Sequence, residues 1–295
     1  MKILSMLRKR EKLLFILPVL IILLVFTTFP YIINLILGCF HMDLSNPVGN
    51  RFIGLQNFVK AVNDFRFWNS IKISGIYVFV TTMVELVLGV AIAILFHKLT
   101  WGRGFFQSLL LIPMVIPPVV VGLNWRMLYD ANYGIVNYFF SLFGLAPQAW
   151  LAQSQYALMA VLFVDFWQYT PFVILLTLGL LTSLPEEQYE AARIDGASGW
   201  QLTWRITLPM IKNGLTVVAT LRAIEAFKEF AKIYLMTSGG PGTATETLNY
   251  YVYQTGFEYF NIGYSSALAA ILFACAIGFT ALFQILTKLT SEEGS

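Results

Sequence analysis

The sequence predicts an all-α integral membrane protein, and three observations support this prediction. Hydrophobic residues make up 58% of the 295-residue chain and charged residues only 12%, with a mean hydropathy of +0.70. Six stretches are apolar over about 20 residues or more, which is the length that a helix needs to cross a bilayer. Lys and Arg collect in alternate connecting segments, as they do on the cytosolic side of membrane proteins.

The six apolar stretches are the predicted transmembrane helices, at residues 13–38, 71–96, 105–125, 156–180, 211–236 and 265–287. The first follows a basic segment, residues 1–12, that resembles the start of a secretory signal peptide. Its apolar run is too long for such a peptide and has no small-residue cleavage site, so we expect an uncleaved span. One membrane domain, residues 13–288, therefore joins the basic N-terminus to a tail at 289–295.

The distribution of basic residues predicts that both termini lie in the cytosol. In that orientation the cytosolic segments contain Lys2, Arg8, Lys9, Arg10, Lys12, Lys98, Arg103, Arg193, Arg205, Lys212 and Lys288, and the outer segments contain Arg51, Lys60, Arg66 and Arg126. The last outer segment, residues 237–264, has no Lys or Arg. The same bias places the polar segment 182–210 in the cytosol.

The third predicted span contains three prolines, Pro113, Pro117 and Pro118. Each removes a backbone donor, so we expect this helix to be kinked or broken. Membranes tolerate such a break where neighbouring protein or water restores the hydrogen bonds. This favours a helix bundle with a cavity, and a purely structural kink is the alternative.

Several classes of function are disfavoured by the composition. The net charge is only +3 and no basic run follows a recognition pattern, so nucleic acid is not an expected partner. The two cysteines and two histidines (Cys39, Cys275, His41 and His97) are isolated and lack metal-ligand spacing. The sequence has neither a Gly-rich phosphate loop nor a nucleophile elbow. We therefore expect no catalytic residue, metal or cofactor in this chain.

The fifth predicted span carries five charged residues, which are Arg222, Glu225, Lys228, Glu229 and Lys232. On a continuous helix all five lie within an arc of about 120°, so the span has one charged face. Charges at this depth are costly and typically mark a water-filled path or a bundle interior. Mutual neutralisation, by pairing Arg222 with Glu225 and Glu229 with Lys232, is the alternative explanation.

If this charged face lines a path through the membrane, we expect Glu225, Lys228 and Glu229 to contact the solute that passes along it or to order the water around that solute. Glu85 in the second span and Asp165 in the fourth are lesser candidates for the same path. Paired carboxylates could also suggest a glycosidase, but nothing in the sequence specifies the pocket that such a pair needs.

Segment 182–210 is unusually polar for its place between two apolar spans. Pro185 suits the first turn of a helix, and Glu186, Glu187 and Glu190 lie near that N-terminus, where the helix dipole favours acids. Gly196 can adopt the positive φ that ends a helix. We predict a helix, a tight turn and a second short helix at the cytosolic surface. A plain interfacial loop rimmed by aromatic residues is the alternative.

The spacing within this segment resembles a known motif. Glu190, Ala191 and Ala192 are followed after three residues by Gly196, and after nine more by Ile206, Leu208 and Pro209. This pattern is similar to the EAA loop in the membrane subunits of binding-protein-dependent ABC importers. Residues 221–269 resemble the fifth span and outer loop of carbohydrate-uptake permeases, and "RMLYDANYGIVNYFF" after the third span is similar too. One departure is Ala231, where those permeases often have Asp.

The resemblance implies that segment 182–210 is a coupling helix seated in a cleft of an ATPase subunit. The implied coupling residues are Glu190, Ala191, Ala192, Asp195, Gly196, Ile206, Leu208 and Pro209, with Glu190 as the charge partner of a basic ATPase residue and Gly196 at the turn. The turn cluster Gly239, Gly240 and Pro241 would face the extracytoplasmic binding protein, although a plain connecting turn is the simplest explanation.

The implied assembly has this chain, a second permease, two ATPases that bind ATP and Mg²⁺, and a solute-binding protein, embedded in lipid of a bacterial or archaeal cytoplasmic membrane. The implied solute is a mono- or oligosaccharide, with glycerol phosphate or another polar solute as alternatives.

Two rival functions are an ion-coupled secondary transporter, which would leave the surface helix pair unexplained, and a membrane-embedded transferase. The transferase should show clustered acidic metal ligands at helix ends, and the sequence has none.

Overall fold

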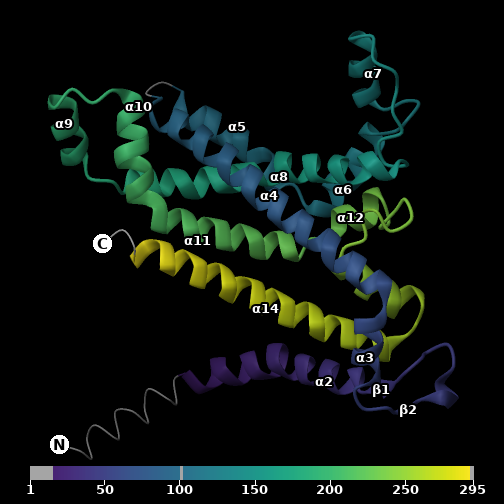
Figure 1. The fold of residues 1–295 in the computed structure, drawn as a ribbon. Coiled ribbons are helices and arrows are strands. Elements are labelled where there is room, and N and C mark those ends of the chain that lie inside the picture. Colours follow the sequence, from purple (N-terminus) through teal and green to yellow (C-terminus); the bar gives the residue numbers. More distant parts are fainter. Residues whose placement is uncertain (1–15, 100–101, 293–295) are drawn as a thin grey trace, which may run out of the picture. The chain divides into compact units, whose positions relative to one another are not determined.

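The computed structural model describes residues 16–99 and 102–292, which are mostly helical (Figure 1). The chain divides into two compact units. The first unit consists of Met1–Asp64 and Val252–Ala274, and the second consists of Phe65–Tyr251 and Cys275–Ser295. The basic N-terminus at 1–12 lies outside the described residues.

The first unit combines a long apolar helix with a short two-stranded sheet. Its elements are η1 (Leu24–Thr28), α2 (Phe29–Gly38), β1 (Phe40–His41), η2 (Pro47–Gly49), β2 (Arg51–Phe52), α3 (Gln56–Asn63), η4 (Gln254–Glu258) and the start of α14 (Ile262–Glu292). Strands β1 and β2 pair antiparallel. The side chain of Asn57 donates hydrogen bonds to the carbonyls of Gly38 (3.0 Å) and Phe40 (2.9 Å), so the end of α2 and β1 are held to α3.

The second unit contains most of the helices. These are α4 (Phe65–His97), α5 (Arg103–Val115), α6 (Pro118–Leu128), α7 (Ile135–Leu142), α8 (Ser154–Thr182), α9 (Glu186–Ile194), α10 (Gly199–Leu202), η3 (Thr203–Thr207), α11 (Leu208–Phe227), α12 (Ala231–Met236) and the start of α13 (Leu248–Tyr253). Helices α9 and α10 lie at one end of this unit, and α7 and α12 lie toward the other (Figure 1).

The core of the second unit forms where α4 packs against α8. A Cβ atom at Gly89 would lie only 2.6 Å from Cγ1 of Val173, so the glycine permits this close approach. Further along the two helices, Ala93 packs against Ile174 and Leu178, with Ile211 of α11 in the same cluster. Helices α4 and α8 therefore form the packed core of this unit, and the start of α11 packs against it.

Four described helices are long and apolar enough to cross a membrane: Ile16–Gly38, Phe65–His97, Ser154–Thr182 and Ile262–Phe279. They coincide with the first, second, fourth and sixth predicted spans, although residues 13–15 of the first lie outside the described part. Helix α14 continues to Glu292, beyond the predicted start of the tail at 289. The count of six spans and the cytosolic position of both termini stay predictions.

The third predicted span is broken, as its prolines indicated. Helices Gly104–Val115 and Pro118–Leu128 are bent by 90° with respect to each other. Ile116 and Pro117 are extended at the break, because a residue before proline is displaced from the helical conformation.

The prediction of one continuous fifth span over 211–236 is wrong. Helix α11 ends at Phe227 and α12 begins only at Ala231. Two side chains replace the helical hydrogen bonds at this break. Asn249 donates its amide to the carbonyl of Lys228 (2.9 Å), and the carboxylate of Glu229 accepts the backbone N–H of Lys232 (2.8 Å). The five charged residues consequently do not share one face of a single helix.

Candidate functional site

Segment 182–210 folds as the predicted helix, turn and helix. Helix α9 begins after Pro185, with Glu186 and Glu187 in its first turn. Gly196 then adopts φ +79° and its N–H donates to the carbonyl of Arg193 (3.1 Å). A positive φ of this size favours glycine, because a Cβ atom is strained there. The turn therefore has one defined geometry.

The second helix of this segment starts with a capping box. The Ser198 hydroxyl accepts from the backbone N–H of Gln201 (3.4 Å), and the Gln201 side chain accepts from the N–H of Ser198 (2.8 Å). The Tyr189 hydroxyl donates to Thr207 Oγ1 (2.9 Å), which connects α9 directly to η3 and the start of α11. Helix α9 is thus connected to the start of α11 by a hydrogen bond as well as by the chain.

Most of the predicted coupling residues lie on the outside of this segment. Glu190, Ala191, Asp195, Gly196 and Pro209 are exposed, whereas Ala192, Ile206 and Leu208 are half-buried. Trp200 and Trp204 lie side by side with ring centroids 5.3 Å apart. The motif did not point to Ile194, whose side chain is 86% exposed at the end of α9.

Five charged residues form a buried chain in which the sign of the charge alternates. We call it the charge chain, and its members in order are Glu85, Arg222, Asp165, Lys232 and Glu229. None is more than 9% exposed. The guanidinium of Arg222 forms ion pairs with both Glu85 and Asp165. The ammonium of Lys232 lies 2.6 Å from Asp165 and 2.7 Å from Glu229.

The charge chain joins four helices of the second unit. Glu85 belongs to α4, Asp165 to α8, Arg222 to α11 and Lys232 to α12, while Glu229 lies in the break between α11 and α12. Buried ion pairs of this kind leave a costly unpaired charge when one partner is removed. The arrangement therefore fixes the broken fifth span against α4 and α8.

Two neutral residues of α8 complete this site, and the sequence analysis missed both. The side-chain N–H of Gln168 donates to the carbonyl of Ile116 at the α5–α6 break (3.0 Å), and its side-chain oxygen accepts from the Lys232 ammonium (3.0 Å). The ring of Tyr169 lies 4.8 Å from the Arg222 guanidinium and 4.5 Å from the Lys232 ammonium, within cation–π range. Asp165 lies three and four residues before them in the same apolar run, and its spacing on a helix could have pointed to both positions.

The structure separates the predicted path residues into two groups. The predicted Glu229–Lys232 pair is present, but Arg222 pairs with Glu85 and Asp165 instead of Glu225. A Glu225 carboxylate oxygen lies 2.7 Å from the Lys228 ammonium, and the side chains of Glu225 and Lys228 are 48% and 64% exposed. The charge chain thus holds helices together, and the Glu225–Lys228 pair is the part that remains accessible.

The turn cluster after α12 is an ordered loop. The Arg66 guanidinium donates two hydrogen bonds from Nε to the buried carboxylate of Glu246 (2.8 and 3.0 Å). Asn69 donates to the carbonyl of Thr243 (3.0 Å), and the Thr245 hydroxyl donates to that of Gly240 (2.9 Å). Gly239, at φ +76°, leaves no room for a side chain next to Tyr250. The loop therefore has a fixed surface.

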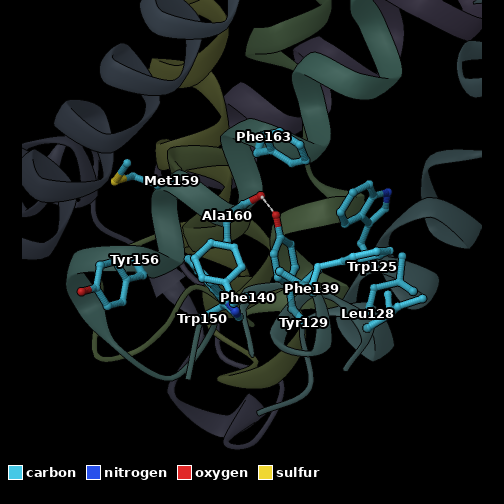
Figure 2. Close-up of a pocket in the computed structure, with 12 residues that line it drawn as sticks. Trp125, Leu128, Tyr129, Phe139, Phe140, Trp150, Tyr156, Met159, Ala160 and Phe163 are labelled. Carbon is cyan, nitrogen blue, oxygen red and sulfur yellow. Dashed lines mark hydrogen bonds between the residues drawn. The ribbon is translucent and has the colours of Figure 1, made fainter. Parts of the chain in front are cut away.

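A pocket of about 480 Å³ lies between the end of α6, α7 and the start of α8 (Figure 2). Aromatic side chains form much of its lining, including Trp125, Phe140, Trp150 and Phe163. The Tyr129 hydroxyl donates to the carbonyl of Ala160 (3.4 Å) beside it. The described lining residues include no charged side chain, so this pocket does not belong to the polar site.

The apolar helices define a multi-pass membrane protein, and the chain can be assigned to a family. Residues 85–292 match the family described as binding-protein-dependent transport system inner membrane component, so the chain belongs to this family. The match includes segment 182–210 and every member of the charge chain. The chain is accordingly a membrane permease component of an ABC importer, which is a transport subunit and not an enzyme.

Curated relatives and solved structures agree with this assignment. The chain is 34% identical over 277 residues to the trehalose/maltose transport system permease protein MalF of Thermococcus litoralis, covering 92% of this chain and 91% of that protein. It is 40% identical over 236 residues to a probable ABC transporter permease, y4oQ, of Sinorhizobium fredii, covering 79% and 76%. A bacterial alginate ABC transporter, solved with an alginate pentasaccharide-bound periplasmic protein, has the same fold, with a TM-score of 0.84, 22% identity and 96% coverage of both chains.

Proposed function

We propose that this chain forms, together with a second permease, the path by which a sugar or oligosaccharide enters the cell. The names of several relatives support the solute class, since these are trehalose, maltose or sulfoquinovosyl glycerol permeases. Glycerol phosphate and other polar solutes remain candidates for the same path. Membership of the ABC importer family supports ATP-driven transport and gives an ion-coupled mechanism no support.

The observation that carries the coupling mechanism is the fixed helix–turn–helix of α9 and α10. Its exposed tip would sit in a cleft of an ATPase subunit, where ATP and Mg²⁺ are bound. A compact helix pair transmits displacement as a rigid body, whereas a flexible loop would absorb it. Glu190 and Asp195 would supply charge for the contact, Ile194 the apolar anchor and Gly196 the turn. Ala191 and Ala192 would allow close approach, and Ile206, Leu208 and Pro209 would hold the exit into α11.

The accessible charged pair at the α11–α12 break is the proposed contact with the solute. Glu225 and Lys228 are exposed and carry both a carboxylate and an ammonium, which can hydrogen-bond sugar hydroxyls directly or through water. Arg222, Glu229, Lys232, Glu85 and Asp165 would hold the helices around this pair.

The two ends of the second unit fit opposite sides of the membrane. The basic residues predict a cytosolic side for α9 and α10, and Figure 1 shows α12 toward the other end of this unit. The ordered loop after α12, with Gly239, Gly240 and Pro241, would then face the extracytoplasmic binding protein. This topology places both termini in the cytosol and needs six spans, with the broken fifth span as one of them.

Replacement of Gly196 tests the coupling proposal with a matched control in the same turn. Gly196→Val forces a β-branched side chain into a left-handed conformation, although space around a Cβ atom is open. Gly199→Val meets equally open space without the positive φ. We expect co-purification of the ATPase in mild detergent to be reduced at least tenfold by Gly196→Val, a loss of about 1.4 kcal/mol or more, and to be retained by Gly199→Val. Equal retention of the ATPase by both variants would refute the coupling role.

A further inference from the structure

The charge chain contains one more acidic than basic side chain. Glu85, Asp165 and Glu229 face only Arg222 and Lys232, so the buried group carries one excess negative charge if all five side chains are ionised. A buried net charge is strongly disfavoured, because neither water nor an opposite charge compensates it. One further positive charge is therefore needed.

The three carboxylates are not equally compensated. Asp165 contacts both Arg222 and Lys232. Glu229 contacts the Lys232 ammonium and accepts the backbone N–H of the same residue, and it lies at the more exposed end of the chain. Glu85 is completely buried and has only the guanidinium of Arg222, which it shares with Asp165. The deficit of positive charge is thus greatest at Glu85.

Among the residues that the structure describes, the side chains around Glu85 offer no second positive charge. The charged groups next to Glu85 are Arg222 of α11 and Asp165 of α8. Tyr77 of α4 lies next to Asp165, and the ring of Tyr169 of α8 lies against Arg222. Lys232 of α12 is engaged by Asp165, Glu229 and Gln168. Glu225 and Lys228 form a separate exposed pair.

The Glu85 and Asp165 carboxyl groups accept hydrogen bonds from the same Nη2 atom of Arg222, so they lie beside each other. Two carboxylates repel at this range, and such a pair is stable when it shares one proton. We propose that Glu85 and Asp165 share a single proton in the folded protein, with the hydroxyl on Glu85 donating to Asp165. The proton is taken up from water as the site closes, and it makes the charge chain neutral. This inference does not depend on which solute is carried.

Infrared difference spectroscopy of the purified full-length chain tests the proposal. The spectrum of the wild type minus that of Glu85→Gln should contain the carbonyl stretch of a protonated carboxylic acid, shifted in D₂O. The matched control is Glu225→Gln in the exposed Glu225–Lys228 pair, which leaves the charges of the charge chain unchanged, and the wild type minus this variant should contain only carboxylate bands. Absence of the acid band from the first difference would overturn the proposal.

The pH dependence of stability provides a second measurement. A proton held by the folded state but not by the denatured state makes stability fall as pH rises. We expect the thermal midpoint of the wild type in detergent to fall from about pH 6 to about pH 9, and Glu85→Gln to remove most of this slope, while the exposed-pair control Glu225→Gln leaves it. An unchanged slope in Glu85→Gln, or failure of this variant alone to accumulate, would contradict a shared proton.

Discussion

Gln168 occupies the position where the two broken helices of this protein meet. Its amide donor satisfies the Ile116 carbonyl that the α5–α6 break releases, and its amide oxygen accepts from Lys232 just beyond the α11–α12 break. A buried carbonyl or ammonium without such a partner carries its full desolvation cost. One neutral side chain therefore supports both irregular regions of the bundle.

Replacement of Gln168 by Leu removes both hydrogen bonds while keeping a similar size. We expect Gln168→Leu to destabilise the protein by roughly 1–3 kcal/mol for each group left without its partner. The control Gln155→Leu lies on the same helix at an exposed position and should change stability little. Thermal denaturation in detergent measures both, and equal midpoints for the two variants would show that Gln168 is dispensable.

Asp130 gives the turn after α6 a predictable response to acid. Its carboxylate accepts hydrogen bonds from the backbone N–H groups of Tyr133 (2.9 Å) and Asn132 (2.9 Å). These two hydrogen bonds lower the pKa of Asp130 below its ordinary value. A lowered pKa stabilises the fold above the unfolded value of about 3.9, and this contribution is lost as pH falls through the folded value. The turn should therefore stay closed at neutral pH.

Hydrogen exchange of the peptide that covers residues 130–137 measures this turn. At neutral pH we expect faster exchange at Asn132 and Tyr133 in Asp130→Ala than in the wild type, because the carboxylate oxygen that accepts both hydrogen bonds is lost. Asp130→Asn, which retains one acceptor oxygen, should lie between them. Identical exchange in the wild type and Asp130→Ala would show that the carboxylate does not hold the turn.

At the scale of elements, one of the two helix breaks could be predicted and the other could not. Pro117 and Pro118 remove donors and displace the preceding residue from the helical region, so the break in the third span is a local property. The break after Phe227 contains Lys228, Glu229 and Phe230, none of which interrupts a helix by itself. It is stabilised by Asn249, twenty-one residues from Lys228, and such a partner is not apparent from local pattern.

The two lysines of this region should respond differently to the same substitution. Lys228→Gln breaks an exposed pair, and such pairs contribute about 0–1 kcal/mol, so stability should hardly change. Lys232→Gln leaves Asp165 and Glu229 buried with less compensation and should cost about 3–5 kcal/mol. Thermal midpoints in detergent distinguish the variants.

If Lys228 contacts the solute, uptake should nevertheless fall in Lys228→Gln, and normal uptake would remove this pair from the path.

The helix–turn–helix fold of segment 182–210 was predictable because its signals are local. Proline before acids, a glycine at the required positive φ and the EAA spacing all lie within thirty residues of sequence, and the structure places them in one helix–turn–helix.

The charge chain was only partly predictable. The sequence identifies its charged members and the Glu229–Lys232 pair, but Arg222 pairs with residues 57 and 137 positions away. Such pairing depends on how α4 and α8 pack, which the apolar pattern does not specify.

At the scale of the whole molecule, the proposed mechanism would place an ATPase at one end of the second unit and a solute path beside the charge chain. Force from the ATPase would pass from α9 through the Gly196 turn and the Tyr189–Thr207 hydrogen bond into α11, whose far end carries Glu225. The charge chain holds α11 and α12 against α4 and α8, so movement of α9 and α10 would change the path and not only the surface.

Sugar uptake into proteoliposomes that contain the complete transporter tests this claim most directly. With ATP and the binding protein supplied, the wild type and Gly199→Val should accumulate the sugar. Uptake should be absent without ATP and reduced at least tenfold in Gly196→Val. Uptake by this chain without an ATPase, or wild-type uptake by Gly196→Val, would contradict the account.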